Sequence, residues 1–119
     1  MKMSRLLDQI KKHPDIHKAG MILCHNGIVR ETSRDIRMVS GLKVEVDHEK
    51  LEAIIRENKK RPGIIEILVE IHEGEVLSIG DDVMLLAIAG DIRDNVIPAL
   101  EDTLNAIKST VTKKTEYYR

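Results

Sequence analysis

The chain has 119 residues, enough for one domain with a single hydrophobic core. Charged residues make up 33% of it and hydrophobic residues 42%, which indicates a globular rather than a disordered protein. The formal net charge is −1 and there is no Phe or Trp, so the basic excess and stacking aromatics typical of nucleic-acid-binding modules are missing.

Residues 1–18 are expected to form an N-terminal helical segment that Ser4 can cap and Pro14 ends. The segment lacks the small-residue cleavage site of a signal peptide, and no apolar run reaches transmembrane length, so we expect a cytoplasmic protein with no membrane partner. His13 and His17 have a spacing that could bind a metal, but Pro14 separates them and no third ligand is near. We therefore expect no metal site.

The first predicted strand begins at residues 19–24 and continues to Arg30. A glycine inside a strand, here Gly27, indicates a bulge or a close backbone approach. His25 and Arg30 are candidates for facing a ligand; the alternative for His25 is a hydrogen-bonded polar group at a strand end. The charged residues 31–37 lack periodicity and predict an exposed loop whose arginines could close over an anion or simply be solvated. Cys24 lies in the apolar run, excludes an internal disulfide and is expected to be a buried, inert thiol.

The middle of the chain predicts a strand, a helix and a hairpin. Residues 39–46 alternate between apolar and polar, and Asp47 is expected to cap a helix that ends before Pro62 and Gly63. Residues 64–72 alternate again and lead through short turns towards the next apolar segment.

Val83–Ala89 is a run of seven apolar residues and predicts a buried strand. An amphipathic helix follows, with an apolar stripe that reaches Val111. If this helix starts at Asp94 or Asn95, Pro98 falls in the first turn, where no N–H is needed. Arg93 would then lie in a loop, free to point into a cleft.

The predicted order is α-β-β-α-β-β-β-α, with residues 111–119 as a basic C-terminal tail. Strand-rich stretches with short turns, flanked by helices, indicate an α+β domain over residues 1–119 with a mostly antiparallel sheet covered by helices on one side.

Catalytic motifs are scarce, since neither a Ser/His/Asp spacing nor a phosphate-binding glycine loop is present. What remains is a set of cations that follow apolar strands or end a helix, which suits an anion pocket because arginines bind phosphate or carboxylate through paired hydrogen bonds. A lysine desolvated among other cations can act as an acid, a base or a nucleophile. These cations are Arg30, Arg93, Lys108, Lys113 and Lys114.

An ordered series of segments resembles the molybdopterin synthase large (catalytic) subunit family over roughly residues 19–118. Ala19–Leu23 followed by Gly27–Arg30 is similar to that family's Gly-x-Val-Arg strand. His72–Glu75 and Ile79–Val83 resemble the family's hairpin, and Arg93 falls on the arginine of the family's His-Arg pair. Lys108 falls on a lysine near the end of the family's last helix, and Lys113–Glu116 falls on its Lys-Lys/Arg-x-Glu region.

The resemblance implies an α/β hammerhead-like fold, a homodimer, and a heterotetramer formed with a small ubiquitin-like sulfur-carrier subunit. The implied activity is a sulfurtransferase step of molybdenum cofactor biosynthesis. The small subunit's C-terminal thiocarboxylate would give its sulfur to cyclic pyranopterin monophosphate, yielding molybdopterin. The pterin phosphate is a substrate, and no cofactor is implied.

The resemblance also assigns roles. Arg30 and Arg93 would bind the substrate phosphate or the tail carboxylate, and Lys108 would be the catalytic lysine. Lys114, or Lys113 if the match slips by one, would hold the substrate.

Two departures from the family leave alternatives open: Ile92 replaces its histidine, and its Phe-Trp before the second lysine is missing. One alternative is a non-catalytic relative that binds a small subunit or an anion as a homodimer. Another is an unrelated anion-binding or regulatory homodimer.

Overall fold

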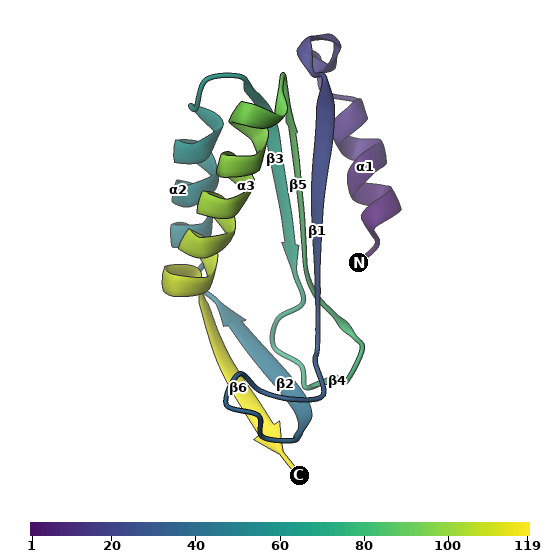
Figure 1. The fold of residues 1–119 in the computed structure, drawn as a ribbon, viewed down its shortest axis with the longest axis vertical. Helices are drawn as coiled ribbons and strands as arrows, with labels where there is room; N and C mark the ends of the chain where they lie inside the picture. The colour runs from purple at the N-terminus through teal and green to yellow at the C-terminus, as the bar shows by residue number, and fades with distance from the viewer.

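The computed structural model describes residues 1–119 and contains two three-stranded antiparallel sheets, β1-β5-β3 and β4-β2-β6 (Figure 1). The predicted α+β class is confirmed. The strands are β1 (Met21–Ile28), β2 (Val39–Val46), β3 (Ile64–Ile71), β4 (Leu77–Ser78), β5 (Asp82–Gly90) and β6 (Thr112–Tyr118). The helices are α1 (Met3–Lys11), α2 (His48–Lys59) and α3 (Arg93–Ala106), with a 3-10 turn η1 (Ile16–Lys18) and a π-helical turn η2 (Ile107–Val111).

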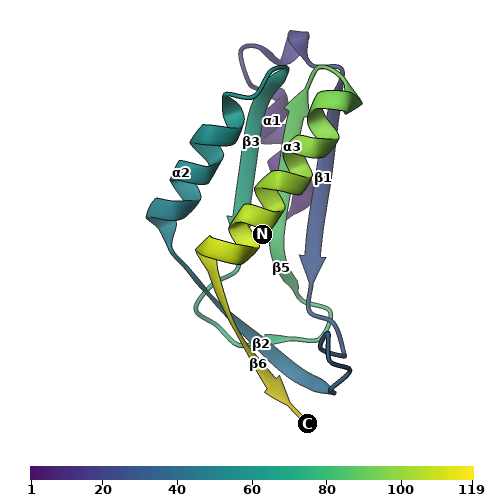
Figure 2. The same cartoon turned by 60° about the vertical axis from the view of Figure 1, so that its left-hand side comes forward.

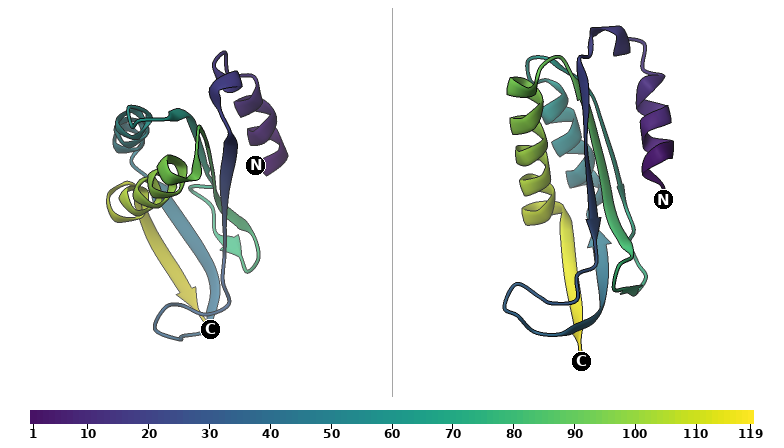
Figure 3. Two further views of the ribbon diagram at one scale, coloured as in Figure 1. Left: turned by 45° about the horizontal axis from the view of Figure 1, so that its top comes forward. Right: turned by 45° about the vertical axis from the view of Figure 1, so that its right-hand side comes forward.

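Strand β5 is the centre of the first sheet and is buried from Met84 to Gly90. Helices α2 and α3 cover one face of this sheet and α1 covers the other (Figures 1 and 3). The expectation of helices on one side only was wrong. Leu85 and Ala87 face the second side, where they pack against Leu6 and Ile10 of α1, because the apolar run of β5 has no polar face.

The second sheet lies at the lower end of an elongated molecule of 48 × 25 × 24 Å (Figure 2). The residues expected only as a basic tail form β6, which pairs with β2 from Val46 opposite Thr112 to Val39 opposite Tyr118. Since β6 directly follows the π-helical turn, the C-terminal basic residues are carried by regular structure.

The helix termini follow the local sequence signals with two differences. Helix α1 starts at Met3 with Lys2 as its N-cap and no side-chain capping hydrogen bond, so the expectation that Ser4 caps it was wrong. Asp47 caps α2 by accepting a hydrogen bond of 3.1 Å from the Lys50 amide, as predicted. Helix α3 starts at Arg93 rather than at Asp94 or Asn95, so Pro98 lies inside the helix and removes one backbone hydrogen bond. Pro98 is exposed, so water can satisfy the freed carbonyl.

Strand β1 shows one confirmed expectation and one error. Its register with β5 shifts between Gly27 and Ile28, which confirms the predicted irregularity. Cys24, however, is exposed rather than buried, because β1 is an edge strand of its sheet. None of the helices is both long enough and apolar enough to span a membrane.

Candidate functional site

A cavity of about 470 Å³ opens where the two sheets meet. Strands β1, β3 and β5 contribute from the first sheet, β2 and β6 from the second, and the loop after β1 and the π-helical turn complete it. Its volume is within the range of about 300–1,000 Å³ typical of small-molecule sites. Its walls are largely aliphatic, and its polar lining residues are His25, Arg34, Lys108, Thr112 and Lys114.

A second cavity of about 280 Å³ adjoins the first and shares Arg34, Lys108 and Lys114 with it. It adds Arg30, whose Nε donates a hydrogen bond of 2.7 Å to the carbonyl of Thr32. The structure therefore brings together Arg30, Lys108 and Lys114, three of the predicted site residues, although 84 positions separate the first from the last (114 − 30).

Lys108 is placed by the π-helical turn that ends α3. In this turn the hydroxyls of Ser109 and Thr110 donate hydrogen bonds of 2.8 Å to the carbonyls of Asn105 and Ala106. Lys108 forms no ion pair with a carboxylate of this chain, so its charge is available to a ligand. π-Helical turns are often found at functional sites.

Lys114 and Lys113 lie on opposite faces of β6, since successive side chains of a strand alternate. Lys114 lines both cavities and forms an ion pair of 3.3 Å with Glu116. Lys113 lines neither cavity. Of the two lysines between which the resemblance left the choice open, only Lys114 lines the cavities.

His25 lines the first cavity from β1, and its Nε2 is buried without a hydrogen-bond partner. Burial lowers the pKa of His25 below its usual value, and the positive charge of Lys108 lowers it further. The imidazole is therefore neutral at pH 7 and adds no positive charge to the cavity. It could still exchange a hydrogen bond with a ligand that reaches Nε2.

Arg93 is not part of this site. It is the first residue of α3, and Lys108 follows fifteen positions later at the opposite end of the same helical rod, about 22 Å away along the axis. Ile92, which stands where the family has histidine, is 54% exposed beside it.

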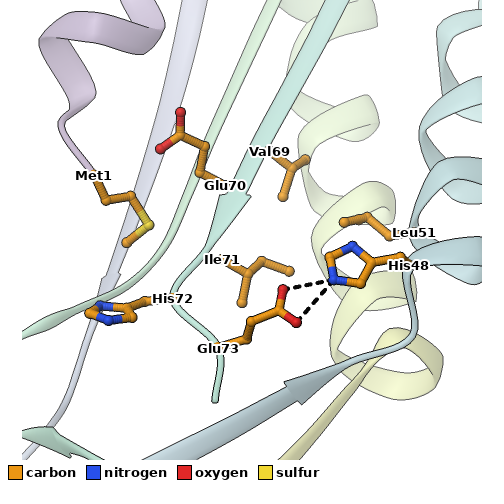
Figure 4. A pocket seen from close by; sticks show the side chains of 8 residues that line it. All are labelled: Met1, His48, Leu51, Val69, Glu70, Ile71, His72 and Glu73. Carbon is orange, nitrogen blue, oxygen red and sulfur yellow. Dashed lines mark hydrogen bonds and ion pairs between the residues drawn. The ribbon is translucent and has the colours of Figure 1, made fainter. Parts of the chain in front are cut away.

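A separate hollow of about 470 Å³ lies between α2, β3 and the N-terminus (Figure 4). Two carboxylates, Glu70 and Glu73, and two imidazoles, His48 and His72, line it, and no lysine or arginine does. His48 Nε2 and Glu73 Oε2 lie 2.8 Å apart, so these two side chains pair with each other. This hollow is unsuited to an anion, so the cationic cavities between the sheets are the candidate site.

Sequence reasoning did not single out Arg34, which lines both cavities. It lies in the charged segment 31–37, which has no periodicity to show which side chains point inwards. The two arginines of that segment, Arg34 and Arg37, differ only in their loop geometry, and a sequence does not specify that geometry.

Comparisons with known proteins identify the family. Residues 2–110 match the family described as "MoaE protein". An uncharacterized protein from Methanocaldococcus jannaschii is 36% identical over 95 residues, which cover 76% of this chain and 79% of that protein.

Solved structures share the fold over essentially the whole chain. Molybdopterin synthase from Staphylococcus aureus superposes with a TM-score of 0.80 at 23% identity and covers 100% of this chain and 86% of that one. Molybdopterin cofactor biosynthesis protein E from Burkholderia multivorans superposes with a TM-score of 0.78 at 22% identity, and the match covers 100% of this chain and 82% of that one. A chain of the complex of subunits 1 and 2 of the molybdopterin-converting factor from Helicobacter pylori superposes with a TM-score of 0.73 at 19% identity, and the match covers 99% of this chain and 84% of that one. The chain therefore belongs to the MoaE protein family of molybdenum cofactor biosynthesis, as its resemblance to the molybdopterin synthase large subunit predicted.

Proposed function

We propose that this chain is a catalytic large subunit of molybdopterin synthase. It would transfer sulfur from the C-terminal thiocarboxylate of a small ubiquitin-like subunit to cyclic pyranopterin monophosphate. The observation that carries the proposal is the meeting of Arg30, Lys108 and Lys114 at two adjoining cavities. The only carboxylate that lines either cavity is Glu116.

The charge of the site matches the two reactants. The thiocarboxylate tail and the pterin phosphate are both anionic, and a cavity with a cationic excess attracts both and stabilises negative charge that develops during the reaction. Lys108 is the best candidate for the catalytic lysine, because it is unpaired and lines both cavities. There its ammonium group would stabilise the attack on the thiocarboxylate and the acyl intermediate.

The remaining residues have binding roles in this proposal. Arg30 would hold the phosphate or the tail carboxylate through its guanidinium group, and Lys114 would hold the substrate from β6. The neutral imidazole of His25 would offer a hydrogen bond rather than a charge. The partner is the small sulfur-carrier subunit, and two copies of this chain would form the homodimeric centre of a heterotetramer in the cytoplasm.

One observation favours a second candidate, a homodimeric module that binds the small subunit or an anion without chemistry. The hydrophobic walls of the larger cavity are aliphatic, from residues such as Leu42, Val44 and Ile71, and offer no aromatic ring on which a pterin could stack.

A reconstitution experiment separates the two candidates. The full chain is mixed with the thiocarboxylated small subunit and cyclic pyranopterin monophosphate, and dithiolene product is measured. A catalytic subunit yields product, and Lys108→Ala loses about a hundredfold or more in rate, as expected when a charge at the reacting centre is removed. Lys60→Ala, at the far end of α2, is the charge-matched control and stays near wild type. A wild type that binds the small subunit but makes no product supports the module instead.

A further inference from the structure

Arg34 is the one cation of the two cavities that was expected only as part of a charged loop, whose arginines could close over an anion or be solvated. It lies in the loop between β1 and β2 and lines both the larger and the smaller cavity. Its guanidinium forms no hydrogen bond or ion pair within the chain, unlike Arg30, whose Nε is bonded to the Thr32 carbonyl. All its donors are therefore available to a ligand.

The loop that carries Arg34 is held in place by its neighbours. Ser33 is only 6% exposed, and its amide donates a hydrogen bond of 2.9 Å to the Arg37 carbonyl. The Arg37 amide in turn donates to Ser33 Oγ at 3.1 Å, and the Val39 amide donates to the Glu31 carbonyl at 2.8 Å. These contacts fix the backbone on both sides of Arg34 and so fix the direction from which it approaches the cavity.

The neighbouring Arg37 has a different environment. Its guanidinium lies 3.6 Å from the centre of the Tyr118 ring, a cation–π contact at the end of β6, and it lines neither cavity. The loop thus directs one arginine to the cavities and stacks the other against an aromatic ring.

Charges in the cavities favour an anionic ligand next to Arg34. Lys114 is partly neutralised by Glu116 at 3.3 Å, whereas Arg34 and Lys108 have no carboxylate partner. A phosphate group can accept paired hydrogen bonds from the Arg34 guanidinium, whose planar fork matches its geometry.

We propose that Arg34 is a phosphate-binding residue of this site, holding the substrate phosphate beside Lys108 where the two cavities meet. This inference rests on the proposed function for the identity of the substrate, but the binding of phosphate itself does not. It also assigns the tail carboxylate of the small subunit to other residues, so Arg34 selects the pterin phosphate rather than the sulfur donor.

Direct binding tests the inference without any catalytic step. Inorganic phosphate is titrated into the full-length protein at low salt and followed by calorimetry and phosphorus NMR. Arg34→Ala is expected to weaken phosphate binding about tenfold, as for loss of one charged hydrogen-bonding group, and Arg34→Lys by less, because it keeps the charge and loses the fork. The loop control Arg37→Ala stays within about twofold of wild type, and thermal melts confirm that each variant is folded.

Two further measurements identify the ligand. In the reconstituted reaction Arg34→Ala raises the KM for cyclic pyranopterin monophosphate and leaves the affinity for the small subunit unchanged. Equal phosphate affinity in wild type and Arg34→Ala, or no phosphate binding by wild type, would overturn the inference whether or not product forms. Weakened small-subunit binding with an unchanged KM for the pterin would overturn it too, because Arg34 would then serve the tail. Phosphate binding that depends on Arg34 in a protein without synthase activity would uphold the inference and refute only the proposed reaction.

Discussion

At the scale of single residues, the neutral imidazole of His25 makes stability depend on pH. Its pKa is lowered in the folded protein, first by burial and then by Lys108, so the unfolded chain binds a proton more readily. Stability contributed by this group is present above the unfolded pKa of about 6.5 and falls as the pH drops below that value towards the lower folded pKa.

We therefore expect wild type to lose more stability than His25→Gln between pH 7 and pH 5 in urea unfolding. Lys108→Ala should lose less than wild type, because the second cause of the lowered pKa is gone. Parallel stability curves for wild type and His25→Gln would show that the protonation of His25 is not linked to folding.

Two glycines with nearly the same backbone angle form a matched pair for a second prediction. Gly63 (φ +78°) and Gly74 (φ +81°) both occupy the left-handed region, which costs a residue with a side chain about 1–2 kcal/mol. A Cβ at Gly74 meets nothing within 4 Å, whereas one at Gly63 collides with the side chains of Asp91 and Asn95.

Gly74→Ala should therefore destabilise the protein by about 1 kcal/mol in urea unfolding, the backbone cost alone. Gly63→Ala should cost at least about 1 kcal/mol more, because Asp91 and Asn95 must move. Equal losses would mean that the loop after α2 rearranges freely to accept the methyl group.

At the scale of elements, β6 allows the register of the site to be tested. Lys114 and Lys113 are adjacent in sequence and have the same charge, but only Lys114 lines the cavities. In the reconstituted reaction we expect Lys114→Ala to lower kcat/KM about tenfold or more, while Lys113→Ala stays within about twofold. The opposite ranking would place the other face of β6 towards the substrate.

The elements themselves were largely predictable from local signals. The run Val83–Ala89 gave β5, and Asp47 marked the start of α2 correctly, because both signals act through neighbouring residues. The second helical layer was missed although the unbroken apolar run of β5 already indicated two covered faces. The pairing of β6 with β2 was not predictable, since strand partners distant in sequence leave no local pattern.

The candidate site was predictable only in part for the same reason. Arg30, Lys108 and Lys114 were named because they follow apolar strands or lie at a helix end, and the family resemblance then gave them roles. Arg34 was not distinguished from the other loop arginine and Arg93 lies elsewhere, because which side chains share a cavity is decided by long-range packing of the two sheets and by loop geometry. Patterns in a single sequence describe neither the packing of the two sheets nor the geometry of a loop.

At the scale of the whole molecule, the position of Arg93 connects the site to the expected homodimer. Arg93 lies about 22 Å along α3 from Lys108, too far to act on a ligand in the cavity of its own chain. If Arg93 binds substrate, as the family resemblance implies, it must do so in the cavity of a second copy, and a symmetric dimer would then build two such sites.

Mixing two inactive variants tests this arrangement. In a dimer of Lys108→Ala with Arg93→Ala, one site carries both defects and the other carries neither. An equal mixture, unfolded and refolded together, should therefore recover about a quarter of wild-type product formation, because about half of the dimers are mixed and each has one intact site. Refolding each variant alone and combining them afterwards is the control and should recover nothing. An Arg93→Ala variant that is fully active on its own would show that Arg93 serves neither its own cavity nor that of a partner.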